Sequence, residues 1–137
     1  MSVMEKFQTY KLEFGTFKKF ENYIVGTPNR YANMGIPEAR EINRVIGTQY
    51  THNFGYIGDR VYSHSADPTV YLYANKENTL LKSVAIVVYS EASRNIAEIE
   101  QQAADASGLN FDIFTDLDSA IQWTGAQLEI RESVHAK

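Results

Sequence analysis

An unbroken apolar run from Val84 to Tyr89 is the strongest pattern in the sequence. A short run rich in valine and isoleucine is typical of a strand buried on both faces, as in a parallel sheet. The pattern then changes to helical spacing, because apolar residues recur every three or four positions. We expect the buried helix face to contain Ala92, Ile96, Ile99 and Ala103. A buried strand followed by an amphipathic helix is half of a βαβ unit, so the pattern predicts an α/β domain.

Alternating apolar and polar residues near the start of the chain predict an antiparallel hairpin. Its first strand is expected within Phe7 to Phe14, and its second within Phe17 to Val25. Gly15 and Thr16 form a two-residue link with glycine first, as a type II′ turn requires. We expect this hairpin to open a central mixed sheet.

The rest of the chain predicts two more strands and three more helices. Proline in a first turn and aspartate as a cap mark helix starts, and paired glycines predict a bulge in the third strand. The whole domain then has about five strands and about four helices, followed by a polar tail from about Glu129. The added elements are a helix from Pro37 to Gly47, a strand from Phe54 to Tyr62, a short helix from Asp67 to Asn75, a strand from Phe111 to Phe114 and a helix from Leu117 to Leu128.

The composition is that of one ordinary globular domain. The chain has 137 residues, and 44 % of them are hydrophobic, which is enough for a working core without disulfides or metals. It has no cysteine, so disulfides, thiolate metal sites and thiol nucleophiles are excluded. We expect a single domain spanning residues 1–137.

Charge and hydropathy argue against two classes of partner. The net charge is −4, and no basic cluster exceeds Lys18 and Lys19, whereas nucleic-acid binding needs a basic stripe. No apolar stretch is long enough for a signal peptide or a membrane span. We expect no nucleic-acid partner, no membrane insertion and a cytoplasmic location.

The sequence lacks the common signatures of cofactor and catalytic sites. It has no dinucleotide-binding glycine motif, no P-loop, no HExxH motif and no GxSxG elbow. His52 and His64 flank the third predicted strand, too far apart to share one ion across a strand of that length. We expect no cofactor, no metal and no catalytic residue.

The loop between the third predicted strand and the short helix is the first candidate site. Ser63, His64, Ser65 and Asp67 precede a helix start, where unpaired N–H groups and the positive end of the helix dipole can hold an anion or a phosphoserine. Capping of the helix explains the same residue types and is favoured. We expect a contact with a ligand or partner here if the loop has a function beyond capping.

The start of the helix after the central strand is the second candidate site. Ser90, Ser93 and Arg94 occupy the equivalent place one strand further along, at the same expected edge of the sheet. One arginine with hydroxyl groups can bind an anion, although capping and a surface ion pair account for the same residues. We expect them to join the first loop in a common binding edge if both have a function beyond capping.

Three segments resemble the SpoIIAA-like branch of STAS domains. The last of them contains an acidic turn leading into an A-[IL]-x-W motif, and the order of expected elements from about Pro37 onward fits the same family. The resemblance implies a SpoIIAA-like α/β fold. The segments are DRVYSHSADPTVY (59–71), AIVVYSEASRNIAEIE (85–100) and FDIFTDLDSAIQW (111–123).

The resemblance also implies a non-enzymatic regulatory or protein-interaction domain. In the anti-sigma antagonists of that family a serine before a helix is phosphorylated, and Ser63 or Ser65 matches its position most closely. The family motif D-[ST]-S-G is not preserved, because Ala66, Asp67 and Pro68 follow Ser65. A related fold occurs in CRAL-TRIO domains, so a carrier or sensor of a small apolar or lipid-like ligand is the alternative.

The opening hairpin also predicts self-association. It carries five aromatic residues, and one of its strands is expected at the edge of the sheet, where unpaired backbone groups favour pairing with another chain. We expect a homodimer through this edge or the aromatic face beside it. The five residues are Phe7, Tyr10, Phe17, Phe20 and Tyr23.

Overall fold

Strands and helices alternate along the chain in the predicted order. The computed structural model describes residues 5–135, with side chains described as far as Glu129. Its helices are α1 (Ile36–Val45), α2 (Val70–Glu77), α3 (Glu91–Ser107) and α4 (Leu117–His135), with a 3₁₀ turn η1 (Gly47–Gln49). Its strands are β1 (Gln8–Leu12), β2 (Gly15–Lys19), β3 (Tyr23–Pro28), β4 (Asn33–Met34), β5 (Phe54–Asp59), β6 (Ser65–Ala66), β7 (Leu81–Val87) and β8 (Asn110–Phe114).

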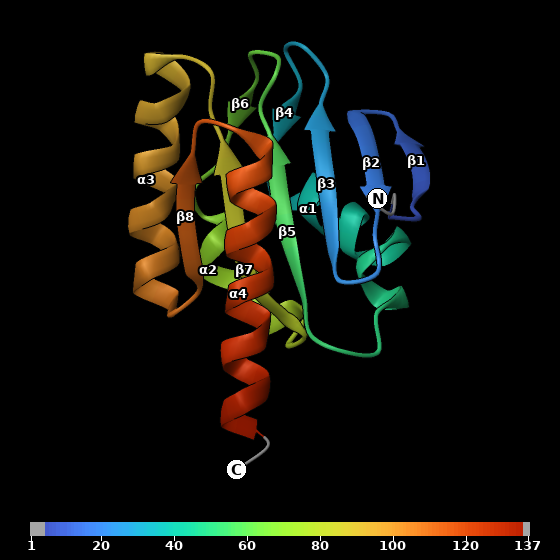
Figure 1. Cartoon of the computed structure of the whole chain (residues 1–137). Helices are drawn as coiled ribbons and strands as arrows, with labels where there is room; N and C mark the ends of the chain where they lie inside the picture. Colours follow the sequence, from blue (N-terminus) through green and yellow to red (C-terminus); the bar gives the residue numbers. More distant parts are fainter. Residues whose placement is uncertain (1–4, 136–137) are drawn as a thin grey trace.

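One mixed sheet of six strands forms the centre of the molecule, in the order β1-β2-β3-β5-β7-β8 (Figure 1). The first three strands are antiparallel, and β3, β5, β7 and β8 run parallel to one another. Val84 to Val88 lie between β5 and β8 and are at most 3 % exposed. The predicted central strand is therefore confirmed, and the sheet has six strands where about five were expected.

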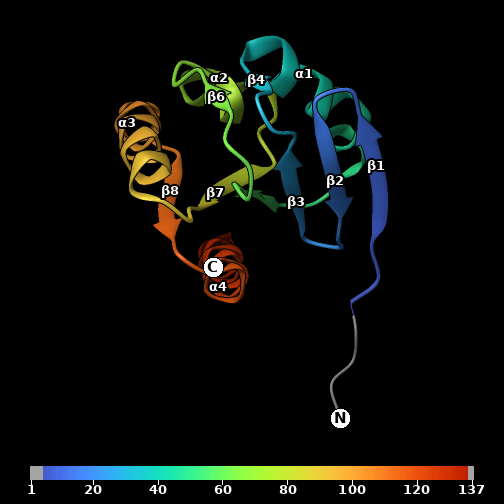
Figure 2. The same cartoon turned by 90° about the horizontal axis from the view of Figure 1, so that it is seen from above.

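Helices cover both faces of the sheet (Figure 2). α4 packs on one face over β5, β7 and β8, while α1 and α2 lie on the other face and α3 packs beside β8. Side chains of β7 alternate between the two layers, since Val84 and Ile86 pack with α3, and Ala85 and Val87 pack with α4. This alternation explains why the part of the strand from Val84 to Val87 is apolar on both faces.

The predicted opening antiparallel hairpin is confirmed, but it is part of a three-stranded meander and its turn lies earlier in the chain than expected. Leu12 pairs with Gly15, which places the first turn at Glu13 and Phe14. Gly15 lies within β2, where a Cβ would come 2.8 Å from the carbonyl oxygen of Thr27 on β3. Glycine is thus required here by close strand packing, and the expected second strand is divided into β2 and β3.

Most aromatic residues of this meander are covered by the protein. Phe17 and Tyr23 are buried, Phe20 stacks on Tyr23 with ring centroids 4.7 Å apart, and only Phe7 among the five is exposed, at 44 %. β1 does lie at the edge of the sheet, as expected. The aromatic face predicted for dimer contact is therefore largely absent, whereas the backbone edge is present.

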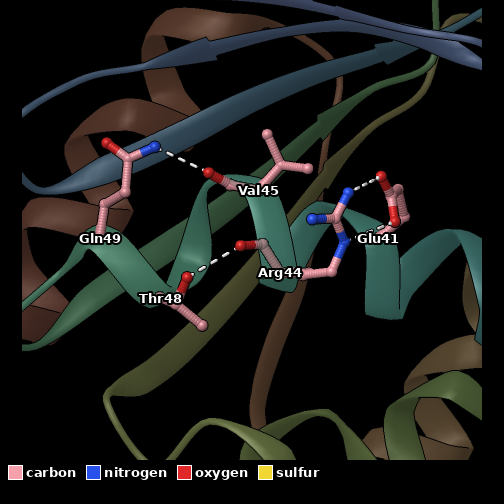
Figure 3. A network of polar contacts seen from close by, with 5 residues as sticks. All are labelled: Glu41, Arg44, Val45, Thr48 and Gln49. Carbon is pink, nitrogen blue, oxygen red and sulfur yellow. Dashed lines mark hydrogen bonds and ion pairs between the residues drawn. The ribbon is translucent and has the colours of Figure 1, made fainter.

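The end of α1 is closed by polar contacts from the 3₁₀ turn η1 that follows it (Figure 3). The Thr48 hydroxyl donates to the Arg44 carbonyl at 2.9 Å, and the Gln49 amide donates to the Val45 carbonyl at 2.7 Å. Arg44 also pairs with Glu41 one turn earlier. These contacts satisfy carbonyls that a helix end leaves free, so the helix stops close to the predicted residue.

The buried face of α3 differs from the predicted one. Ile99 is 54 % exposed, while Ala97, Glu100 and Ala104 are fully buried. The buried face is therefore shifted by about one position from the expected one, and a charged residue, Glu100, lies at its centre. The partner of Glu100 lies across the helix–sheet interface, as described below.

The last helix extends beyond its predicted end. α4 continues to His135, so the backbone from Glu129 to His135 is helical where a polar tail was expected. Asp116 caps the start, since its Oδ1 accepts the Ser119 N–H at 2.8 Å. Ala120, Thr124 and Leu128 form the buried face.

Candidate functional site

A cavity of about 120 Å³ lies between the α1–α2 layer and the sheet. β4 and β6, which form a separate parallel pair, contribute to the same wall through Met34 and Ala66. An engineered apolar cavity of about 150 Å³ binds benzene, so the space suits one small ring. The apolar residues that line it include Ile24, Ile42, Val70, Ala74, Val84 and Ile86.

Two of the residues that line the cavity, Arg60 and Glu100, form a buried ion pair. Arg60 follows β5, and Glu100 is on α3. Arg60 Nη1 lies 2.5 Å from Glu100 Oε1, and Nη2 donates to Oε2 at 2.6 Å. Only 6 % of the Arg60 side chain and 1 % of the Glu100 side chain are exposed. Burial is the largest single effect on the pKa of Arg60 and lowers it, but the hydrogen bond to Glu100 and the electrostatic effects of Tyr71, Glu100 and Tyr56 together outweigh burial. The pKa is therefore raised, and the guanidinium stays charged.

Two tyrosines lie close to this ion pair, Tyr56 on β5 and Tyr71 on α2. Burial raises the pKa of both phenols, while Arg60 and Glu100 act on them in opposite directions. Both hydroxyls therefore keep their protons at neutral pH. The Tyr56 hydroxyl also lies directly over Gly26 of β3, where a Cβ would collide with its oxygen.

His64 is the fifth polar residue of this group. Its Nδ1 lies 3.0 Å from the Ser65 carbonyl oxygen, which can only accept a hydrogen bond, so Nδ1 carries the proton. Burial lowers the pKa of His64, and nearby Arg60 lowers it further, against the opposing effects of the Ser65 carbonyl and Glu100. The imidazole is thus neutral at pH 7, and its Nε2 is a buried acceptor without a partner among the residues described.

Polar contacts join α1 and α2 beside the cavity. Arg40 on α1 pairs with Glu77 on α2 at 2.8 Å, and the Asn78 amide donates to Asn43 at 2.8 Å. Asn43, Glu77 and Asn78 also line the cavity. The two helices are therefore tied to each other where they cover it.

The structure separates the residues of the first predicted loop. His64 and Asp67 line the cavity, whereas Ser63 is exposed and Ser65 belongs to β6, where its hydroxyl donates to Asn33 Oδ1 at 2.9 Å. Asp67 was expected as the N-cap of α2, but Thr69 is the N-cap residue. The Asp67 carboxylate instead accepts the N–H and the hydroxyl of Thr69, at 3.0 and 2.7 Å, which orders the turn before the helix and lowers the pKa of Asp67.

The residues of the second predicted site serve the start of α3. Ser90 is the N-cap, and its Oγ accepts the Ser93 N–H at 3.1 Å. Ser90, Ser93 and Arg94 are not among the residues that line the cavity. The capping interpretation accounts for Ser90, and an anion contact by this group stays a prediction.

Sequence reasoning missed Tyr56, Arg60, Tyr71 and Glu100, which come from β5, the segment after it, α2 and α3. Glu100 was not part of the expected buried face of its helix, and charged side chains are rarely buried without a partner. The sequence feature that indicates burial of Glu100 is its spacing, since it lies three residues after Ala97 and four residues before Ala104 on the same helix face. No local pattern marks Arg60, because its partner is 40 positions away in the sequence.

The sequence predicts neither a metal site nor membrane insertion, and the described residues bear on each. Within residues 5–129, no three His, Asp or Glu side chains gather in a way that would hold a metal ion. None of the helices in the described part of the chain is long and apolar enough to span a bilayer.

Comparison with known proteins identifies the fold. No family model matches the sequence, and a search of curated proteins finds no match. Among solved structures, the chain is similar to an uncharacterised protein of the DUF3478 family from Shewanella loihica PV-4, which has a SpoIIAA-like fold. The TM-score is 0.54 at 12 % identity, covering 90 % of this chain and 98 % of the other. The predicted SpoIIAA-like fold is therefore confirmed.

Proposed function

We propose that this protein is a non-enzymatic regulatory domain that senses a small, mainly apolar molecule held in the cavity between α1, α2 and the sheet. The observation that carries the proposal is the cavity itself, with the buried pair of Arg60 and Glu100 among its lining residues. This function combines the two roles expected from the sequence, a regulatory domain and a sensor of a small apolar ligand. Binding of the ligand beneath α1 and α2 would be the signal that the regulatory domain passes on to a partner.

The buried ion pair supports a binding role, because burying two charges often costs more free energy than filling the same space with apolar side chains. Removing two charges from water costs several kcal/mol for each ion, and well-packed apolar residues of similar volume are often equally stable or better. Arg60 and Glu100 are joined by Tyr56, Tyr71 and His64, which come from different parts of the chain. Polar groups that converge on an apolar cavity are the usual arrangement of a small-molecule site.

Several titratable groups in one concave site are also what an enzyme requires. The directions of the pKa shifts in this site favour a binding role over catalysis. A general acid or base is most effective when its pKa lies near the operating pH, whereas the pKa values of Tyr56 and Tyr71 are raised further from neutrality. The Glu100 carboxylate is already held by two contacts from Arg60.

The size of the cavity restricts the ligand. Sites for drug-sized ligands usually measure about 300–1,000 Å³, and this cavity has about 120 Å³. A lipid with a long acyl chain would need a large separation of α1 and α2, which the Arg40–Glu77 pair opposes. A sensor of a small molecule is therefore favoured over a lipid carrier.

Native mass spectrometry tests this function. We expect the purified protein to carry a small molecule in stoichiometric amount, and Ala74→Phe, which fills the cavity from α2, to lose it. Ala126→Phe on the exposed side of α4 is the matched control and should retain it. A folded protein that never yields a bound molecule, from native extracts or after screening with small ring compounds, would refute the proposal.

A second candidate is a protein-interaction surface at the carboxyl edge of the parallel strands. Tyr31, Tyr62 and Tyr89 follow β3, β5 and β7 and are exposed, with Tyr31 82 % exposed and held at a positive φ of 64°. The Tyr31 N–H donates to the Ser63 carbonyl at 2.7 Å, so the expected phosphorylation position lies beside this surface. The test is whether Tyr31→Ser together with Tyr62→Ser abolishes a partner complex that the wild-type protein forms in solution.

A further inference from the structure

We propose that the ligand is a small uncharged ring compound that carries a hydroxyl group, of which phenol is the simplest example. The inference rests on the proposed function, since it specifies the chemistry of a ligand in the same cavity. Three properties of the described residues point to it: the size of the cavity, the balance of charge among its polar residues and the hydrogen-bonding groups without partners.

Size and charge limit the ligand to small neutral molecules. The cavity of about 120 Å³ is somewhat smaller than the apolar cavity of about 150 Å³ that binds benzene, so a ring of six atoms with a short substituent is the upper limit for the ligand. Arg60 and Glu100 neutralise each other through two contacts. A ligand carboxylate would add an uncompensated negative charge near Glu100, and a ligand ammonium would add an uncompensated positive charge near Arg60. Burying either unpaired charge costs free energy.

The hydrogen-bonding groups then select a hydroxyl. The protonated Tyr56 hydroxyl makes no hydrogen bond to another described side chain and is a donor. His64 Nε2 is an acceptor, because Nδ1 donates to the Ser65 carbonyl, and it is buried without a partner in the described part of the chain. A ligand hydroxyl can accept from Tyr56 and donate to His64, whereas a ketone or an ether can only accept.

Isothermal titration calorimetry with three probes of similar shape tests this assignment. We expect phenol to bind the wild-type protein roughly tenfold more tightly than toluene, since toluene leaves the polar groups without partners. Benzoate should bind more weakly than toluene because of its charge. Benzoate binding more tightly than phenol would overturn the charge argument.

Variants identify the residues that recognise the hydroxyl. His64→Phe and Tyr56→Phe should each reduce the preference for phenol over toluene, because each variant removes one of the two polar groups that the ligand hydroxyl would satisfy. His52→Phe is the matched control, because His52 is exposed at the opposite end of β5, and it should keep the full preference. The two cavity variants are independent of each other, so the loss of one to misfolding leaves the other as the test.

The outcomes separate this inference from the proposed function. Equal binding of phenol and toluene to the wild-type protein would refute the hydroxyl while supporting a ligand-binding cavity. Retention of the phenol preference in both variants would refute the roles of Tyr56 and His64. Absence of binding by all three probes would refute this inference, and the proposed function would then be decided by the molecule found in native mass spectrometry.

Discussion

Arg60 and Glu100 carry opposite charges in a place where only 6 % and 1 % of their side chains are exposed to water. Removing one partner leaves the other as an isolated buried charge, so Arg60→Met or Glu100→Gln should each lower the free energy of unfolding by about 3–5 kcal/mol. Replacing both with methionine should restore most of that stability, because apolar side chains of similar length fill the same space. Urea denaturation measures all three variants, and a double variant as unstable as the single ones would show that the pair itself stabilises the fold.

His64 makes stability depend on pH. Its pKa in the folded protein is lowered, mainly by burial, from an unfolded value of 6.5. As the pH falls below 6.5, the unfolded chain takes up a proton that the folded protein does not, so the free energy of unfolding decreases until the pH passes the folded pKa. The stabilisation is fully present above pH 6.5.

Denaturant unfolding at a series of pH values checks this contribution. His64→Gln should flatten the dependence that the wild-type protein shows just below pH 6.5. Asp67 and Asp116 also have lowered pKa values, but their contributions are lost only below pH 3.8, in a separate range. The same slope in wild type and His64→Gln would assign the effect to other groups.

At the scale of elements, the pairing of β3 with β5 depends on Gly26. A Cβ there would collide with the Tyr56 hydroxyl and come 2.8 Å from the Phe17 ring. Gly26→Ala should therefore destabilise the protein by roughly 1–3 kcal/mol, and Tyr56→Phe in the same chain should recover part of the loss. Gly125→Ala is the control, since no atom lies within 4 Å of its added Cβ, and it should stabilise α4 by roughly 0.5–1 kcal/mol. Thermal or urea unfolding gives these values, and a neutral Gly26→Ala would contradict the packing described.

The elements were largely predictable because their signals are local. Val84 to Val87 are the continuous apolar part of β7, and Pro37 lies in the first turn of α1. The buried faces of the helices were less predictable, since which residues are buried depends on the side chains that pack against the helix. Ile99 was assigned to the interior by its hydrophobicity, but the buried position belongs to Glu100 because Arg60 lies across from it.

At the scale of the whole molecule, β1 leaves one edge of the sheet without a neighbouring strand in the described part of the chain. Backbone groups at such an edge favour pairing with another chain, so we expect a homodimer in which two β1 strands meet. Sedimentation equilibrium measures this association, and a monomer at high micromolar concentration would contradict it.

The candidate site was less predictable than the fold. The sequence placed His64 and Asp67 in a functional loop, and both line the cavity. The ion pair that marks the site joins residues 40 positions apart, and the cavity walls come from α1, α2, β4, β6 and the sheet. Such a site depends on how the layers pack, which no local pattern in a single sequence records.

The most direct test of the cavity as a binding site is an NMR titration of the ¹⁵N-labelled protein with toluene, which requires only the apolar space. We predict that the shifted amides will cluster in α1, α2 and β5, around the residues that line the cavity, and that Ala74→Phe will abolish these shifts while Ala126→Phe preserves them. Shifts that map instead to Tyr31, Tyr62 and Tyr89, or saturable shifts that persist in Ala74→Phe, would contradict the account.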